Sequence, residues 1–582
     1  MHLGSIKKKL GLLSVTRLIT FILAIITLIY ILKFSTVLAI ASCLILLVLF
    51  GAQVKIFIKN NKTKLHIDSL IDINDKEINA LNYDYKNFAE GSEYIDTTHP
   101  YSFDLDIFGE GSLFQFLNRT STQTGKDKLA LWLSTPELNP ENITSKQDSI
   151  RELSGMIDCR QDFNASGIQY DESDSDMQLI NEWINEPIYY KNKTAFKILS
   201  LLFPLFTISA LIAAIFSFTF IDLFIILFLM QLFVTVLRLR YNNRIHSIIG
   251  KRLDMLRKYK QLFAYIDNED FKSEILLKLQ NKLKYNNNSA NKIIGKLAGI
   301  VSAFDNRLNI LVGVILNGLL LWDIQCIMRL EKWKLKYKNE IPGWFDVLGE
   351  FDALSSLATY YFNFPNQVFP IPGEKTVLHA VNLGHPLINE KERVNNNIDI
   401  FNENEFIIIT GANMAGKSTF LRTIGVNLIL AMCGAPVCAS KFEFKLVNLF
   451  TSMRTNDSLQ KHESYFYAEL KRLKELIEKL YNKEKLFILL DEILKGTNSE
   501  DKQKGSKVVL EQIIRLKGTG IIATHDLELA KSEDKFPEKI KNKCFEIDID
   551  GEEIFFDYKL VDGITKKMNA TLLMKQMGIL IK

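Results

Sequence analysis

The chain has 582 residues, of which 47% are hydrophobic and 24% are charged, and its formal net charge is +4. The length predicts about three or four domains, and the nearly neutral charge excludes a strong electrostatic attraction of the whole chain to nucleic acid. Six cysteines are scattered along the chain without the spacing of a metal site, and their pattern does not indicate a disulfide framework.

Residues 1–60 are predicted to form a transmembrane helical hairpin. Lys33 is the only charged residue between Leu18 and Val54, and about forty residues suffice for two membrane-spanning helices of roughly twenty each. A tight turn at Lys33 would place its charge at the far interface, because a charge at the bilayer centre is costly. The polar residues that follow, 61–107, are predicted to be a linker.

Residues 196–240 are predicted to form a second transmembrane hairpin. Asp222 is the only charged residue between Ile198 and Leu237. By the positive-inside rule, basic flanks predict a multi-pass protein of the cell membrane whose termini and soluble parts, the C-terminal domain included, lie in the cytoplasm. The flanking basic residues are Lys7, Lys8, Lys9, Arg17, Lys55 and Lys59 around the first hairpin and Lys191, Lys193, Lys197, Arg238, Arg240 and Arg244 around the second.

The two apolar regions have competing interpretations. A secretory signal peptide ends in a cleavage site of small residues after a single apolar run, whereas this chain has two apolar regions and no such exit. Helices buried in a soluble core seldom contain about forty consecutive residues with one charge. Membrane-spanning hairpins therefore remain the favoured prediction.

Residues 241–382 are predicted to be helical. Apolar residues recur there at intervals of three and four positions, which is the spacing of one helix face. They include Leu253, Leu256, Leu262 and Ile266. The segments Leu316–Asp323 and Ala353–Ala358 continue the pattern, so this region is expected to carry a helical body up to the C-terminal domain.

The C-terminal part of the chain contains a predicted phosphate-binding loop. Phe406–Thr410 predicts a buried strand, and the following Gly411–Ser418 fits the template G-x-x-x-x-G-K-[ST] ahead of a helix. Gly411 and Gly416 let the backbone wrap the phosphates, Lys417 reaches the β- and γ-phosphates, and Ser418 can hold magnesium. The predicted nucleotide-binding residues are Gly411, Asn413, Gly416, Lys417, Ser418 and Thr419.

Two further strands end in residues suited to phosphate chemistry. Leu486–Leu490 runs into Asp491 and Glu492; the aspartate is a candidate magnesium ligand and the glutamate a candidate base for the attacking water. Gly520–Ala523 leads to His525, which could contact the γ-phosphate. Because strand ends of a parallel sheet meet at one edge, the predicted catalytic residues are Lys417, Glu492 and His525, and the predicted metal ligands are Ser418 and Asp491.

The C-terminal part of the sequence resembles a known family. Four segments are similar to the ATPase domain of the MutS family of DNA mismatch-repair proteins: TGANMAGKSTFLRTIG from Thr410, SYFYAELKRL from Ser464, LLDEILKGTNS from Leu489 and ATHDLELA from Ala523. His385-Pro386 resembles the short motif that opens the family's domain. Residues 383–582 are therefore expected to form an α/β P-loop ATPase domain of the ABC/MutS type.

The resemblance extends to the region before the ATPase domain. The segments Gly111–Thr120 and Leu129–Trp132 are similar to the opening of the MutS core domain. This implies that residues 108–195 form the first part of an all-α core and that residues 241–382 supply the rest of the core and its lever helices. The second hairpin would interrupt the core.

The family also implies cofactors and partners. ATP and Mg²⁺ would bind in a homodimer with composite sites, in which Ser464 of the S-x-F-x-x-E element (Ser464, Phe466, Glu469) reaches the nucleotide of the other chain. The turn of Gly496, Thr497 and Ser499 resembles the family's dimer contact. DNA is an implied partner, but the stretch before residue 108 is too short for the family's mismatch-recognition domain, so mismatch-specific reading is not expected.

Two departures from the family pattern concern the nucleotide. Ala412 stands where the family usually has proline, and Arg393-Val394 stand where an aromatic-aliphatic pair usually packs on adenine. The sequence therefore predicts a membrane-anchored MutS-like ATPase without identifying its adenine contacts. Two alternatives stay open: an ATPase related to ABC transporters, although no L-S-G-G-Q signature is found, and a membrane scaffold that ATP switches without DNA binding.

Overall fold

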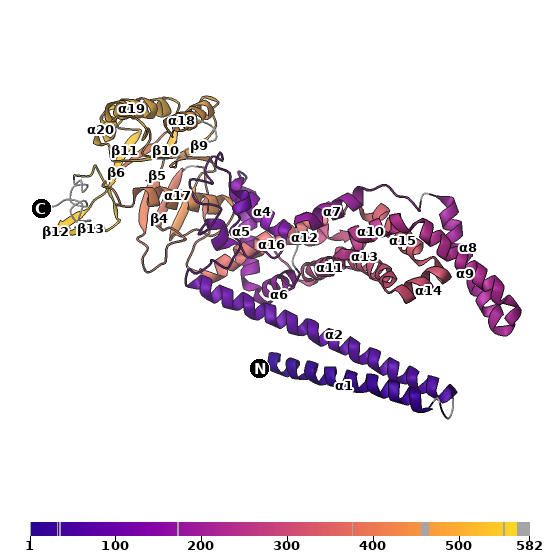
Figure 1. Cartoon of the computed structure of the whole chain (residues 1–582). Helices are drawn as coiled ribbons and strands as arrows, with labels where there is room; N and C mark the ends of the chain where they lie inside the picture. The colour runs from indigo at the N-terminus through magenta and orange to yellow at the C-terminus, as the bar shows by residue number, and fades with distance from the viewer. Residues whose placement is uncertain are drawn as a thin grey trace.

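The computed structural model describes residues 2–566 apart from 32, 34–35, 171–173, 192, 375, 455–464 and 551–552. Figure 1 shows an α/β domain at one end, a helical core in the middle and two helical hairpins that extend away from the α/β domain. The hairpins point towards the same side of the molecule. The tips of the apolar hairpins thus lie away from the α/β domain.

The first hairpin consists of α1 (His2–Ile31) and α2 (Thr36–Leu81). The two helices pack along each other, with a Gln53 side chain donating to Thr20 Oγ1 at 3.1 Å and the rings of Phe21 and Phe50 6.4 Å apart. Most of their large apolar side chains are exposed, for example Leu18 and Leu47. No other described segment of the chain covers these side chains.

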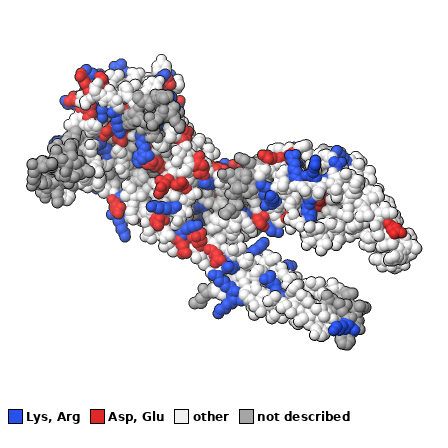
Figure 2. Space-filling model, in the orientation of Figure 1, with Lys and Arg blue, Asp and Glu red and all other residues white. Residues whose placement is uncertain are grey.

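The second hairpin consists of α8 (Thr194–Phe216) and α9 (Ile221–Leu237), joined by the 3₁₀ turn η2 (Phe218–Phe220). Its outer side chains are apolar and exposed, whereas Thr207 and Gln231 face each other and are fully buried. By length and composition, four described helices could each cross a membrane: Leu3–Thr27, Ala41–Leu81, Thr194–Phe216 and Phe218–Leu237. In Figure 2 the hairpins are mostly uncharged, and charged atoms gather near their bases and over the rest of the molecule.

The predicted linker over residues 61–107 is wrong in two respects. The helix α2 continues without a break to Leu81, because residues 61–81 contain neither proline nor glycine. After the short η1 turn (Ser92–Tyr94), the chain folds onto the α/β domain and buries Tyr101, Leu105 and Ile107. These apolar residues are too few and too irregularly spaced to stand out in a polar stretch.

The helical core contains twelve described helices. They are α3 (Leu113–Leu117), α4 (Gln123–Ser134), α5 (Pro140–Gly155), α6 (Ile157–Gly167), α7 (Asp174–Asn185), α10 (Leu239–Ile249), α11 (Leu253–Asn268), α12 (Glu274–Lys282), α13 (Ala290–Asp305), α14 (Ile310–Leu320), α15 (Trp322–Tyr337) and α16 (Ile341–Asn363). Near the α/β domain, α16 packs against α4 and α5, and buried Asp352 accepts hydrogen bonds from the backbone of Ser121 and Thr122 at 3.0 and 2.9 Å. Away from it, a two-stranded ribbon, β1 (Lys284–Tyr285) and β2 (Asn288–Ser289), precedes α13.

The α/β domain contains a six-stranded sheet in the order β14-β11-β6-β10-β9-β8, parallel except for β14. A four-stranded sheet, β3-β7-β4-β5, lies beside it. The strands are β3 (Ile371–Pro372), β4 (Leu378–Leu383), β5 (Asn396–Ile400), β6 (Phe406–Gly411), β7 (Lys441–Phe444), β8 (Asn448–Ser452), β9 (Leu486–Asp491), β10 (Thr519–Thr524), β11 (Ile540–Phe545) and β14 (Leu560–Asp562), with a small ribbon of β12 (Asp548–Asp550) and β13 (Glu553–Phe555). The domain thus begins with β3, ahead of the predicted boundary at residue 383.

Both faces of the parallel sheet are covered, as its continuous apolar strands require. Along β6, Ile407 and Ile409 join the core on the α17 (Lys417–Met432) face, whereas Phe406 and Ile408 join the core formed with α18 (Tyr465–Tyr481) and α19 (Ser499–Arg515). Two short helices, α20 (Leu527–Ala530) and α21 (Ser532–Lys535), follow β10. This layered arrangement fixes where the strands end.

The carboxylate of Asp104 ties the segment before the core to the α/β domain. It is buried and accepts hydrogen bonds from Thr451 Oγ1 at 2.6 Å, Met453 N at 3.1 Å and Arg454 N at 2.9 Å. Arg472 of α18 donates to the carbonyls of His99 and Pro100 from the same segment, at 2.8 and 2.7 Å.

We expect Asp104→Ala to destabilise the protein by about 3 kcal/mol, because three donors would lose a buried, charged acceptor. The matched control is Asp96→Ala, an exposed aspartate whose side chain accepts from Thr98 on the same segment, and this change should cost less than about 0.5 kcal/mol. Thermal unfolding in detergent would measure both. Equal losses of stability in the two variants would show that the hydrogen bonds of Asp104 add no stability beyond that of an exposed aspartate.

Candidate functional site

The register of three parallel strands brings the predicted chemical groups to one edge of the sheet. Thr524 pairs with Thr410, and Ala523 pairs with Asp491. The glycine-rich loop after β6, the acidic pair after β9 and His525 after β10 are therefore neighbours. The glycine-rich loop and Glu492 border a pocket of about 430 Å³, whose other walls come from the end of β4, the β4–β5 loop, α17, Phe545 and Tyr558.

The loop Gly411–Gly416 leads directly into α17, so the first free N–H groups of the helix face the pocket. Gly416 has a φ of 99°, and a Cβ atom there would lie 3.1 Å from the Tyr558 ring. Only glycine combines this left-handed conformation with so close an approach. The next turn presents Ser418 and Thr419 on the exposed side of the helix, towards the pocket.

Lys417 lies at the centre of the loop. Its side chain is 6% exposed, and Nζ donates to the carbonyls of Gly411 and Ala412, both at 2.8 Å. Burial lowers the pKa of Lys417, while the nearby carboxylates Glu492 and Asp491 act in the opposite direction. A buried cation held by loop carbonyls is ready to exchange these contacts for phosphate oxygens.

Asp491 and Ser418 form the part of the site suited to a divalent cation. Burial raises the pKa of Asp491, and a hydrogen bond from Ser418 opposes this shift. One carboxylate oxygen of Asp491, Oδ1, is buried without a hydrogen-bond partner. A hydroxyl and a carboxylate are the hard oxygen donors that Mg²⁺ prefers, with the rest of its shell left to phosphates and water. The residues present therefore fit Mg²⁺.

Glu492 and His525 face each other across the ends of β9 and β10. Glu492 Oε1 lies 3.2 Å from His525 Nδ1. The His525 imidazole, followed by Lys495 and Lys417, lowers the pKa of Glu492 to about 2. Glu492 is therefore ionised at neutral pH, and its φ of 50° is a strained conformation of the kind found at functional sites.

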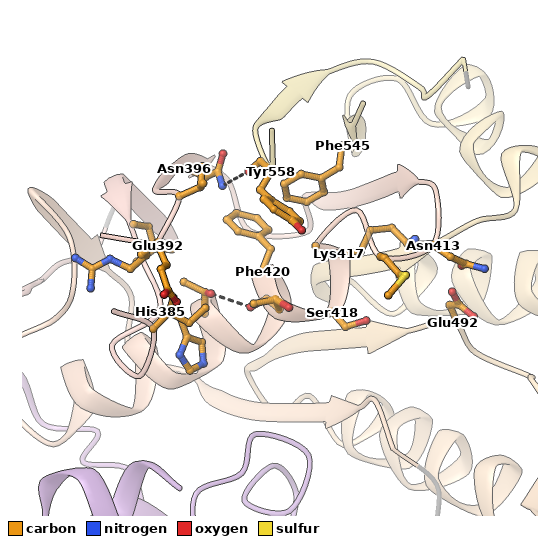
Figure 3. Close-up of a pocket in the computed structure, with 18 residues that line it drawn as sticks. His385, Glu392, Asn396, Asn413, Lys417, Ser418, Phe420, Glu492, Phe545 and Tyr558 are labelled. Atoms are coloured by element: carbon orange, nitrogen blue, oxygen red, sulfur yellow. Dashed lines mark hydrogen bonds between the residues drawn. The ribbon is translucent and has the colours of Figure 1, made fainter. Parts of the chain in front are cut away.

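The structure adds aromatic residues that the sequence did not reveal. Phe420 and Phe545 pack edge-to-face with ring centroids 5.7 Å apart, and Tyr558 lies over Gly416. Figure 3 shows these three rings on one side of Lys417, with Asn413 and Glu492 on the other. They come from α17, β11 and the segment after β13, which no local pattern links. Arg393 and Val394 also line the pocket.

Near these rings, His385 forms another part of the wall. Its burial, followed by the charge of Arg422, lowers the pKa of His385 to about 4, so the imidazole is neutral at physiological pH. The sequence does not identify residues that could contact an adenine. The aromatic rings and the neutral His385 on this wall of the pocket are candidates for that contact.

The S-x-F-x-x-E element is attached to the turn after β9 of the same chain. Glu469 is 4% exposed and accepts hydrogen bonds from the backbone N–H groups of Leu494 and Lys495. Phe466 packs against the core between the sheet, α18 and α19. Ser464, the predicted contact to a second chain, lies outside the described residues. The turn of Thr497 and Ser499 lines a polar groove that also contains His525.

Among the described residues there is no group of three or more histidine, cysteine, aspartate or glutamate side chains that could hold a metal on its own. All cysteines are free, and five of the six are buried. A metal at this edge would therefore be shared with a bound phosphate.

Comparisons with known proteins agree with the geometry. The chain matches MutS domain III over residues 97–358 and MutS domain V over residues 407–578. The DNA mismatch repair protein MutS of Thermotoga maritima is 31% identical over 249 residues, which are 42% of this chain and 30% of that protein. MutS protein homolog 4 of Homo sapiens is 34% identical over 199 residues, which are 32% of this chain and 21% of that protein.

These aligned regions span less than a third of the length of either curated relative. The two domain matches nevertheless cover more than half of this chain, in the order expected from the motifs. The helical core and the α/β domain that carries the pocket therefore both match domains of the same family. The chain belongs to the MutS family.

Proposed function

We propose that this chain is a membrane-anchored ATPase that binds Mg²⁺ and ATP at the edge of β6, β9 and β10. The observation that carries the proposal is the convergence of Lys417, Asp491 and Glu492 at one edge of the sheet, beside the pocket. Lys417 binds the β- and γ-phosphates, and Ser418 and Asp491 hold Mg²⁺, which supplies charge neutralisation when bound. Glu492, ionised and adjacent to His525, orients and deprotonates the attacking water.

The nucleotide site is completed by a second chain. Ser418, Thr419 and Met414 are exposed on the triphosphate side, and half-exposed His525 borders an open polar groove. Ser464 of a partner would approach the nucleotide from this side, as the family resemblance implies. Family membership also supports a role on DNA in repair or recombination, without preference for a mismatch.

The hairpins anchor the ATPase in the cell membrane. Support comes from four helices of sufficient length and apolarity, from their exposed apolar side chains and from basic residues near both ends of each hairpin. Burial of this surface in hydrocarbon removes the cost of exposing it to water. The helical core then links the membrane to the ATPase domain.

Lys417→Ala should abolish nucleotide binding, whereas Glu492→Gln should bind ATP normally and hydrolyse it at least about 100-fold more slowly, since only the water-activating group is lost. A fluorescent ATP analogue would report binding, and phosphate release would report hydrolysis. Normal hydrolysis by Glu492→Gln would rule out the assigned base.

Ser464→Ala should impair hydrolysis but leave nucleotide binding nearly intact, because its hydroxyl acts on the partner's nucleotide. Differently tagged Ser464→Ala and Lys417→Ala chains, co-expressed and purified as a heterodimer, should regain one working site. Heterodimers of two Ser464→Ala chains are the control. A heterodimer as inactive as this control would indicate a site completed within one chain.

The proposed membrane topology can be tested by chemical labelling of single introduced cysteines. Cysteines that replace Lys33 and Asp222 should react with an impermeant thiol reagent added outside intact cells, and cysteines that replace Lys62 and Lys251 should react only after permeabilisation. Protection of both Lys33→Cys and Asp222→Cys in intact cells would contradict the proposed insertion of the hairpins.

A further inference from the structure

The helix α14 gives one region of the core an apolar outer surface. Residues 308–322 contain no charged side chain. Leu308, Ile310 and Leu311 are 68, 79 and 77% exposed, and Ile315 is 53% exposed. The helical pattern predicts Leu316–Asp323 as part of the helical core, and the structure places this end of the core beside the second hairpin. A contiguous apolar surface of this kind indicates a contact partner.

This helix packs directly on the second hairpin. A Cβ atom on Gly318 would lie 2.2 Å from the Phe228 ring of α9, so only glycine allows the two helices to approach this closely. The Gln231 side chain donates to the Leu319 carbonyl at 3.4 Å, and Gln325 donates to the Ser200 carbonyl of α8 at 3.3 Å. The apolar surface of α14 is therefore continuous with that of α8 and α9.

Polar side chains between α14 and α9 point inwards. The amide nitrogen of Gln231, which is fully buried, donates to Thr207 Oγ1 at 2.5 Å. Asn317 is 6% exposed and donates to the Gly313 carbonyl at 3.0 Å and to Asp323 at 3.2 Å. Exposed Asn309 at the start of α14 accepts from Val312 N at 3.2 Å, so it too has a partner within the helix. Polar groups with partners inside the protein suit a hydrocarbon environment, because no water is present there to satisfy them.

The contacts lie on the membrane side of an aromatic and basic belt. At the base of the hairpin, Arg238 donates to the Tyr189 hydroxyl at 2.8 Å, and Lys193 Nζ lies 4.0 Å from the centre of the same ring. Such belts mark the membrane–water interface. Gln231 and Phe228, which α14 contacts, lie about two and three helical turns beyond Arg238 along α9.

We infer that α14 is a re-entrant helix inserted into the same lipid bilayer as the second hairpin, with hydrocarbon covering Leu308, Ile310, Leu311 and Ile315. Its eleven residues span only about 16 Å, roughly half of the hydrocarbon thickness. It must therefore enter and leave on one side, as the 112° bend between α13 and α14 allows. The inference rests on the proposed anchoring and adds that the helical core itself is embedded.

Spin labels in liposomes test the insertion. Single cysteines would replace Leu311, Leu229 and Leu131 in a Cys43→Ser background, where the five remaining native cysteines are buried. Leu229 lies in the middle of α9 and is 56% exposed, and Leu131 lies on α4 and is 53% exposed. The protein would be reconstituted into phosphatidylcholine–phosphatidylglycerol vesicles, and collisions with oxygen and with nickel-EDDA would be measured.

The inference predicts that Leu311→Cys, like Leu229→Cys, collides frequently with oxygen and rarely with nickel-EDDA, and that Leu131→Cys shows the reverse. A lipid signal at Leu229→Cys with a water signal at Leu311→Cys would overturn the inference and leave the anchoring intact. Protection of Leu311→Cys from both reagents would also overturn it, since it would mean that a second protein copy covers α14. A water signal at Leu229→Cys would refute the anchoring itself.

Discussion

The parallel pairing of β6, β10 and β9 determines where each chemical group of the nucleotide pocket lies. Because these strands run in the same direction and in close register, the loop holding Lys417, the acidic pair at Asp491 and the histidine after β10 must emerge side by side. Both faces of the sheet are covered by helices, so the strand ends cannot shift independently. The low pKa of Glu492 and the buried ammonium of Lys417 follow from this crowding.

The same domain is connected to the rest of the chain, including the apolar hairpins, by two physical routes. Asp104 and Asp106 belong to the segment before the core, and Asp106 pairs with Arg422 of α17 at 2.7 Å. The other route is α2, which runs unbroken from the first hairpin to Glu77. There the carboxylate accepts from Arg119 and Asn363, at 2.5 and 2.8 Å.

Beyond the end of α2, Tyr83 and Arg393 line one small pocket, and Arg393 also lines the nucleotide pocket. The pocket is thus separated from the end of α2 by only a few side chains. The tips of both apolar hairpins lie on the side of the molecule away from the α/β domain (Figure 1).

The sequence predicted the features that depend on local pattern. Strand, loop and helix around Gly416 follow from composition over a few residues, and the two apolar hairpins follow from long stretches with a single charge. Tyr558 and Phe545 reach the pocket only through the pairing of β11 with β6, and a tertiary contact of this kind leaves no local signal. The prediction of a linker over residues 61–107 was wrong because a few buried apolar residues lie within a mostly polar stretch. The eleven-residue α14 is too short to be recognised as a membrane segment.

The central claim is that ATP draws two membrane-anchored chains together across the nucleotide site. Electron–electron distance measurements on Val508→Cys, an exposed position of α19, test it most directly, with the Glu492→Gln, Cys43→Ser protein in nanodiscs. The account predicts that MgATP produces a defined interchain distance, and that this distance is absent when Lys417 is also changed to alanine. The same distance distribution with and without MgATP would contradict the account.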